Sequence, residues 1–200
     1  MKRITLGLVA LAAMLTTLQV FALPIGQPAP DFNLTNLQGK PVKLADYRGK
    51  YVVLEWTNPG CPFVLKHYDS GNMQSLQKDA AMQGVAWLTI DSNNPAHPDY
   101  KTPAQLSAWL KDKGAAPTAA MLDSDGKVAK LYEAKATPHM FVIDPSGKLI
   151  YAGAIDNKRS TDLEDVKSAD NYVKAALADA RAGRPVAKAS TQAYGCSIKY

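Results

Sequence analysis

Residues 51–64 read YVVLEWTNPGCPFV and combine an apolar strand, a tight turn and a single cysteine. The first six residues are mostly β-branched and aromatic, which is typical of a strand, and the segment NPG that follows the strand favours a turn. Pro62 suits the first turn of a helix, so Cys61 is expected at or beside the N-cap. Free backbone N–H groups and the helix dipole favour a thiolate there. This stretch predicts a reactive sulfur at the end of a buried strand.

The N-terminus has the pattern of a secretory signal peptide. Residues 1–22 begin with Lys2 and Arg3, continue as an apolar run and end in the small residue Ala22. This order of charged, apolar and small residues is that of a cleaved leader. The alternative is an uncleaved membrane anchor, for which the run has only marginal length. We therefore expect an exported, periplasmic protein from which residues 1–22 have been removed.

The rest of the chain has the length of one domain with a full core. We assign residues 23–183 to this domain and residues 184–200 to a C-terminal tail that carries Cys196, the second of the two cysteines. The net charge of +5 is mild and the basic residues are scattered, so no nucleic-acid partner is expected. No second long apolar run follows the leader, so no membrane contact is expected after cleavage.

Hydrophobic patterning predicts an α/β fold. A small hairpin is expected over 32–44, with strands over 51–57, 85–90, 118–122, 137–144 and 148–153. Helices are expected over 62–68, 73–82, 103–113, 127–132 and 171–182, and residues 156–170 form a polar surface insertion. Strands and helices alternate before a final hairpin, which predicts a central mixed β-sheet flanked by helices on both faces. Functional loops gather at the carboxyl ends of parallel strands, where Cys61 falls.

Several segments, taken together with Cys61, resemble the thioredoxin superfamily in its exported redoxin branch, the AhpC/TSA or peroxiredoxin-like proteins. These segments are GQPAPDF at 26–32, YRGK at 47–50, Thr137-Pro138 before FVID at 141–144, and Gly147. The resemblance implies a thioredoxin-like fold with an N-terminal β-hairpin extension. It also implies that the peptide before Pro138 is cis and that this proline packs against the active-site sulfur.

Two departures from the family pattern concern the active site itself. Val64 stands where a C-x-x-C motif would have its second cysteine, so a dithiol cannot close there. Compared with typical peroxiredoxins, Asn58 replaces a threonine, and Pro138 stands about where their thiolate-stabilising arginine would be. The chain most resembles the peroxiredoxin-like redoxins that have a Cys-Pro-aromatic-Val segment.

Cys61 is the predicted nucleophile, and the alternative is a buried, inert thiol. Cys196 is predicted to be the resolving thiol that attacks oxidised Cys61. Two alternatives remain open for Cys196: a static disulfide that stabilises the tail, and an unpaired thiol. Lys66 and His67, on the helix that follows Cys61, are expected on a solvated face.

Four further residues complete the predicted catalytic site. Thr137 and Pro138 form the loop that faces the sulfur. Asn58 is a hydrogen-bond partner near the sulfur or else a plain turn residue. His139 is a charge partner or proton donor, or else a strand-edge histidine with no role.

These residues and the resemblance together imply an oxidoreductase without cofactor or metal. The preferred hypothesis is a thiol peroxidase that reduces peroxides and is regenerated by an external thiol. A second is a one-cysteine exchanger that acts on protein disulfides. A third is a copper carrier that uses Cys61, His139 and Met140, and a fourth is a non-catalytic module in which a Cys61–Cys196 disulfide is a staple.

Overall fold

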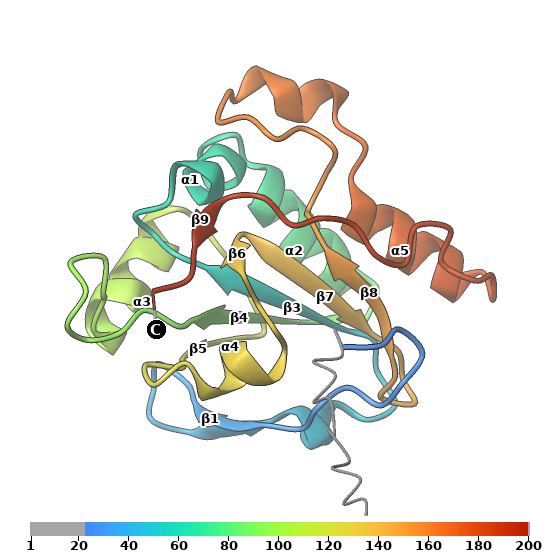
Figure 1. Cartoon of the computed structure of the whole chain (residues 1–200), viewed down its shortest axis with the longest axis horizontal. Helices are drawn as coiled ribbons and strands as arrows, with labels where there is room; N and C mark the ends of the chain where they lie inside the picture. Colours follow the sequence, from blue (N-terminus) through green and yellow to red (C-terminus); the bar gives the residue numbers. More distant parts are fainter. Residues whose placement is uncertain (1–22, 200) are drawn as a thin grey trace, which may run out of the picture.

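The computed structural model describes residues 23–199, so the predicted signal peptide lies outside the described residues (Figure 1). The strands are β1 (Asn33–Thr35), β2 (Pro41–Lys43), β3 (Val52–Thr57), β4 (Ala86–Asp91), β5 (Ala119–Leu122), β6 (Ala136–Thr137), β7 (His139–Ile143), β8 (Leu149–Gly153) and β9 (Cys196–Ser197). The helices are η1 (Leu44–Tyr47), α1 (Pro62–Asp69), α2 (Asn72–Met82), α3 (Pro103–Asp112), α4 (Lys127–Leu131), η2 (Glu164–Ser168) and α5 (Tyr172–Arg181).

The central sheet has the order β5-β4-β3-β7-β8. Strand β3 is its middle strand, parallel to β4 on one side and antiparallel to β7 on the other. Every residue of β3 is buried, which explains its nearly unbroken apolar sequence. The predicted thioredoxin-like α/β fold, with a mixed sheet and an N-terminal hairpin, is therefore confirmed.

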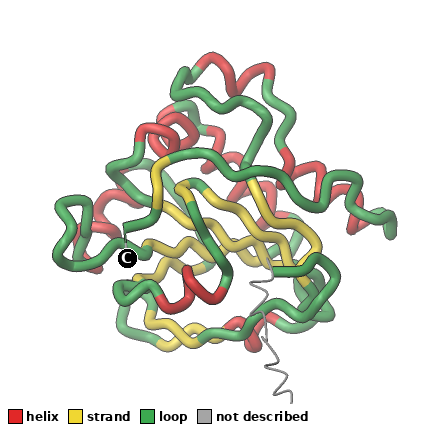
Figure 2. The backbone as a smooth tube through the Cα atoms, viewed as in Figure 1, coloured by secondary structure: helices red, strands yellow, loops and turns green. Residues whose placement is uncertain are grey.

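Two cores cover the two faces of this sheet. Val53 and the buried residues of α1, α2, α3 and α5 form one core, whereas Leu54, Trp56 and α4 belong to the other. Figure 2 shows α4 and the β1–β2 hairpin on the side of the sheet away from α1 and α2. Successive side chains of a strand point to opposite faces, so each residue of β3 and β7 is committed to one core.

Two of the segments that carried the family resemblance meet at one corner of the molecule. The Arg48 guanidinium donates a hydrogen bond to the Ser146 carbonyl oxygen at 2.9 Å. Gly147 beside it has φ +84°, and a Cβ at this position would lie 0.8 Å from Arg48 Nη1. The glycine is needed both for its left-handed backbone and for the space that arginine occupies.

The C-terminal tail lies against the domain along the edge of the sheet. Ala152 of β8 exchanges backbone hydrogen bonds with the tail, donating to the Ala189 carbonyl and accepting from the Thr191 N–H, both at 3.1 Å. Farther along, β9 pairs with β6 in antiparallel register. The tail thus satisfies backbone groups that an open sheet edge would leave exposed. The predicted insertion at 156–170 is largely exposed and contains only the short helix η2.

A buried carboxylate, Glu55, crosses from β3 to the helices. It accepts hydrogen bonds from Trp87 Nε1 at 2.7 Å, the Tyr68 hydroxyl at 2.8 Å, Thr89 Oγ1 at 3.0 Å and Gln77 Nε2 at 3.4 Å. Burial raises the pKa of Glu55, and these four hydrogen bonds oppose that rise. The side chain therefore ties β3, β4, α1 and α2 together below the predicted active site.

Substitutions of Glu55 test how much this shared hydrogen-bond acceptor contributes to stability. Glu55→Leu has a similar size but leaves four donors without this acceptor, so we expect the free energy of unfolding to fall by at least about 3 kcal/mol. Glu55→Gln keeps one acceptor oxygen and should lose about 1 kcal/mol. Urea denaturation monitored by tryptophan fluorescence measures both, and a leucine variant as stable as the unmodified chain would contradict this account.

Candidate active site

The turn after β3 is built by Asn58, which is 1% exposed. Its side-chain oxygen accepts a hydrogen bond from the Gly60 N–H at 2.8 Å, and its backbone oxygen accepts one from the Cys61 N–H at 3.0 Å. Its amide nitrogen donates to Asp99 Oδ2 at 3.2 Å. Asn58 therefore shapes the backbone that carries the cysteine, which agrees with the turn interpretation.

Cys61 is the N-cap residue of α1, with Pro62 in the first turn, as the sequence predicts. Its sulfur makes no capping hydrogen bond to the helix. Instead the thiol donates to the Thr137 carbonyl oxygen at 3.1 Å. The Thr137–Pro138 peptide is cis, so the predicted loop does meet the sulfur. Cys61 is also only 1% exposed, which is more enclosed than a freely accessible nucleophile.

Cys196 reaches the same point from the far end of the chain. Strand β9 places it opposite Thr137, and the Thr137 hydroxyl donates to the Cys196 carbonyl oxygen at 3.5 Å. Both thiols are free, and Cys61 is close enough to Cys196 to affect its ionisation. Burial, and then the neighbouring Cys61, raise the pKa of Cys196 to about 12. At neutral pH Cys196 is therefore a thiol.

The structure does not place His139 beside the sulfur, which corrects the expectation based on its position after Pro138. Its ring stacks on Phe141 with centroids 4.4 Å apart, in the core on the other face of the sheet. Met140, the next residue, points to the core that contains Cys61. Burial, and then Lys135, lower the pKa of His139 to about 4. Consecutive strand residues face opposite ways, so His139 and Met140 do not converge with Cys61 as a copper carrier would require.

Lys66 and His67 are also placed differently from the prediction of a solvated helix face. Both side chains are buried, at 1% and 0% exposure. The loop after β8 and the tail cover this part of α1, with Asp156 and Tyr194 against the two side chains. Burial, and then Lys66, lower the pKa of His67 to about 3, so its ring is neutral at physiological pH.

An open cleft of about 640 Å³ lies beside the tail, between Phe63, Lys135, His139, Arg159 and Tyr194. Neither cysteine lines it. This cleft, which Gly195 also lines, is therefore next to the thiols but is not their direct entrance. Among residues 23–199, no group of three His, Cys, Asp or Glu side chains is arranged to hold a metal ion.

Comparison with known proteins identifies the family. The sequence model of the AhpC/TSA family matches residues 25–152. The chain belongs to the AhpC/TSA family. Thiol-disulfide oxidoreductase ResA of Bacillus thuringiensis is 29% identical over 126 residues, covering 63% of this chain and 67% of the relative. A putative peroxiredoxin of Helicobacter pylori is 31% identical over 116 residues, covering 56% and 67%. This AhpC/TSA chain is an oxidoreductase, as predicted.

Solved structures extend the similarity over most of the AhpC/TSA chain. An uncharacterized conserved protein from Geobacillus kaustophilus has a TM-score of 0.77 and 29% identity, covering 89% of this chain and 93% of its own. A hypothetical protein from Sinorhizobium meliloti has a TM-score of 0.73 and 26% identity, covering 90% and 96%. A putative thiol:disulfide interchange protein DsbE from Chlorobium tepidum has a TM-score of 0.58 and 26% identity, covering 78% and 99%. Within residues 23–199, no helix has the length and apolar character needed to cross a bilayer.

Asp91 is a buried acid near the site that the sequence analysis missed. It ends β4 opposite Thr57, the last residue of β3, and it is 1% exposed. One carboxylate oxygen accepts from the Asn93 N–H at 2.9 Å, whereas the other has no hydrogen-bond partner among the described residues. Burial raises the pKa of Asp91 to about 7, against the opposing effects of the Asn93 N–H and Lys101.

The titration of Asp91 should be visible in the pH dependence of stability. Its folded pKa of about 7 lies above its unfolded value, so its stabilising contribution is complete below about pH 4 and is lost as the pH rises through 7. We expect the free energy of unfolding to fall over this window by up to about 4 kcal/mol more than in Asp91→Asn.

Urea denaturation between about pH 4 and pH 8 measures this difference. Asp125→Asn is the matched control, because Asp125 is exposed and its pKa is lowered by Lys127, so it titrates below the window. Parallel pH profiles for the unmodified chain and Asp91→Asn would contradict a raised pKa of Asp91 in the folded protein.

Proposed function

We propose that this chain is an exported two-cysteine thiol peroxidase, with Cys61 as the nucleophile and Cys196 as the resolving thiol. The observation that carries this proposal is the position of Cys196, which is strand-paired with Thr137, the residue whose carbonyl oxygen accepts the Cys61 thiol. A static disulfide would need the same position, so the resolving role requires a disulfide that forms and is reduced again during turnover.

The proposed reaction oxidises Cys61 with peroxide, joins it to Cys196 in a disulfide and then reduces that disulfide. The Cys61 thiolate attacks one oxygen of a peroxide, the O–O bond breaks, and the leaving alkoxide or hydroxide takes up a proton. Cys61 is then a sulfenic acid. The Cys196 sulfur attacks the Cys61 sulfur, water leaves, and a disulfide forms. Two equivalents of an external thiol then reduce this disulfide, which restores both cysteines and leaves the external thiol as a disulfide.

The surrounding residues position Cys61 and take no part in bond making or breaking. The Thr137 carbonyl orients the Cys61 thiol, and Pro138 continues the loop that encloses it. Asn58 holds the turn before Cys61. His139 faces the other side of the sheet, so we assign it no step.

The enclosure of the site favours a small oxidant over a folded client. Cys61 is 1% exposed, so the tail or the loop has to shift before a substrate reaches the sulfur. A peroxide needs a small opening. A protein disulfide would need an extended segment to lie against Ala136–Thr137, where β9 already occupies the strand edge.

A second function, thiol–disulfide exchange with protein clients, is favoured by the similarity to ResA. In that case β9 would leave the Ala136–Thr137 edge and a client strand would take its place. Export to the periplasm is part of both proposals and rests on the leader pattern of residues 1–22. A solved relative described as a pneumococcal exposed lipoprotein thioredoxin, at 26% identity and a TM-score of 0.50, is compatible with it.

Peroxide consumption by the reduced protein tests the first function. With hydrogen peroxide and dithiothreitol, we expect steady turnover for the unmodified chain and none above background for Cys61→Ser. Cys196→Ser should still react once, stop as the sulfenic acid, and turn over only as fast as dithiothreitol attacks that acid directly. Mass spectrometry after peroxide treatment should show the Cys61–Cys196 disulfide in the unmodified chain.

The same variants separate the two functions. If the substrate is a protein disulfide, Cys196→Ser should accumulate mixed disulfides with clients through Cys61, and peroxide should be consumed no faster than by Cys61→Ser. That pair of results would replace the peroxidase proposal with the exchange function.

A further inference from the structure

A buried polar cluster lies next to the two cysteines and takes no part in the reaction above. It consists of Lys66 and His67 from α1, Asp156 from the loop after β8, and Tyr194 from the tail, which are 1%, 0%, 1% and 5% exposed. Buried charges are costly unless they are paired and hydrogen-bonded. A cluster of this kind therefore calls for an explanation beyond simple packing.

The hydroxyl of Tyr194 is the centre of this cluster. It donates a hydrogen bond to Asp156 Oδ1, and it accepts one from His67 Nε2 at 3.2 Å and one from Lys66 Nζ at 3.5 Å. His67 Nδ1 accepts from the Asn72 amide at 2.8 Å, which leaves the proton on Nε2. A hydroxyl has one donor and two acceptor positions, so all three positions of Tyr194 are used.

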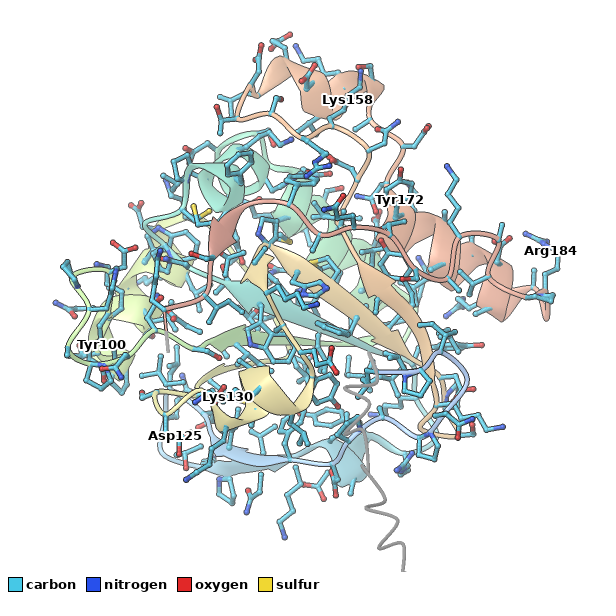
Figure 3. The ribbon with its side chains drawn as sticks, viewed as in Figure 1. Tyr100, Asp125, Lys130, Lys158, Tyr172 and Arg184 are labelled. Atoms are coloured by element: carbon cyan, nitrogen blue, oxygen red, sulfur yellow. The ribbon has the colours of Figure 1, made fainter. Side chains whose placement is uncertain are left out.

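Two opposite charges flank the hydroxyl. The Lys66 ammonium also donates to the Lys158 carbonyl at 2.7 Å and lies 5.3 Å from the centre of the Tyr194 ring. Lys158 belongs to the insertion beyond α1 (Figure 3). Asp156 Oδ2 lies 3.9 Å from His67 Nε2 and has no hydrogen bond among the described residues. Removing the tyrosine oxygen would leave these buried groups undercompensated.

A single glycine, Gly195, separates Tyr194 from Cys196, the proposed resolving cysteine. Gly195 has φ +130°, and a Cβ there would lie 2.0 Å from the Thr137 carbonyl oxygen. The tail therefore runs flat against the same carbonyl that accepts the Cys61 thiol. Once the Tyr194 ring is fixed in the cluster, Cys196 falls opposite Thr137 in β9.

We propose that Lys66, His67, Asp156 and Tyr194 form a latch that positions Cys196 for its attack on oxidised Cys61. Tyr194 is a positioning residue in this scheme, because it acts on the reaction only through the register of the tail. The inference rests on the proposed function of Cys196 as the resolving thiol. Without the latch, the last residues of the tail are free to leave β6, and the effective concentration of Cys196 at Cys61 falls.

Tyr194→Phe tests the latch because it removes one oxygen atom and keeps the ring, which packs against Phe63. The reduced protein is mixed rapidly with hydrogen peroxide. Sulfenic acid formation at Cys61 is followed by dimedone labelling, and disulfide formation by mass spectrometry. We expect sulfenic acid to form at least as fast as in the unmodified chain, because a looser tail opens the site more often, and disulfide formation to slow at least about tenfold.

A slower second step also has a signature that a merely structural role would not produce. Sulfenic acid that persists is open to further oxidation to the sulfinic acid. At high peroxide, Tyr194→Phe should therefore accumulate more Cys61 sulfinic acid than the unmodified chain. Tyr47→Phe is the matched control, because it removes the hydroxyl of a tyrosine that packs against the other core. It should change neither sulfenic acid formation nor disulfide formation.

Gly195→Ala is a second variant that disturbs the pairing of β9 with β6, because its Cβ would collide with the Thr137 carbonyl oxygen. It should slow disulfide formation like Tyr194→Phe, and it decides the question if the phenylalanine variant does not fold. Disulfide formation at the unmodified rate in both variants would overturn the latch alone. If the unmodified chain forms no Cys61–Cys196 disulfide with peroxide, the proposed function fails and the latch fails with it.

Discussion

The peptide group of Thr137 is the point on which the active site depends. Its carbonyl oxygen accepts the Cys61 thiol at 3.1 Å, and Gly195 lies flat against the same oxygen. The backbone of residue 137 is also the strand partner of Cys196. One residue thus fixes two sulfurs that lie far apart in the sequence. In a C-x-x-C motif both cysteines share one helical turn, whereas in the reaction we propose the second sulfur comes from β9, which pairs with β6 at Thr137.

In the proposed reaction Val64 can stand where a second cysteine would be expected. Val64 is fully buried in the core that contains Cys61, so it contributes packing under α1. The resolving sulfur then has to arrive on a separate segment, and a segment at the chain end has high conformational entropy when it is not anchored. Contacts on both sides of residue 196 restrict the tail and so offset that entropy. Tyr194 supplies them before it, and the Asn94 N–H binds the Lys199 carbonyl after it at 2.7 Å.

Local sequence signals predicted the regular elements and the position of Cys61. Thr102 and Pro103 start α3 with a capping box, as their spacing indicates, and Pro62 marks the start of α1. The resemblance supplied the cis peptide at Pro138. These features depend on residues close by in the sequence or on a family pattern, so they can be predicted without knowledge of tertiary contacts.

The contacts of the tail could not be predicted in this way. Strands β6 and β9 have two residues each, which is too short to show the alternation of apolar and polar residues that marks a strand in a sequence. The face on which His139 lies depends on where β7 begins, and a shift of one residue reverses it. Lys66 and His67 are polar residues on a short helix, and only the loop carrying Asp156 and the tail carrying Tyr194 bury them. The spacing of His67 three residues after Val64 was the one available signal, because these positions share a helix face.

The enclosure of Cys61 and the anchoring of Cys196 impose opposite demands on the tail. Cys61 is 1% exposed in the reduced state, so entry of any oxidant requires the chain around it to open. Resolution of the oxidised sulfur requires the same chain to close in register. An anchor made of hydrogen bonds to one hydroxyl suits both demands, because it breaks as a unit when the Tyr194 ring withdraws and re-forms only in one geometry. A continuous apolar anchor would hold the tail at least as firmly but would specify its register less sharply, and register is what brings one sulfur to the other.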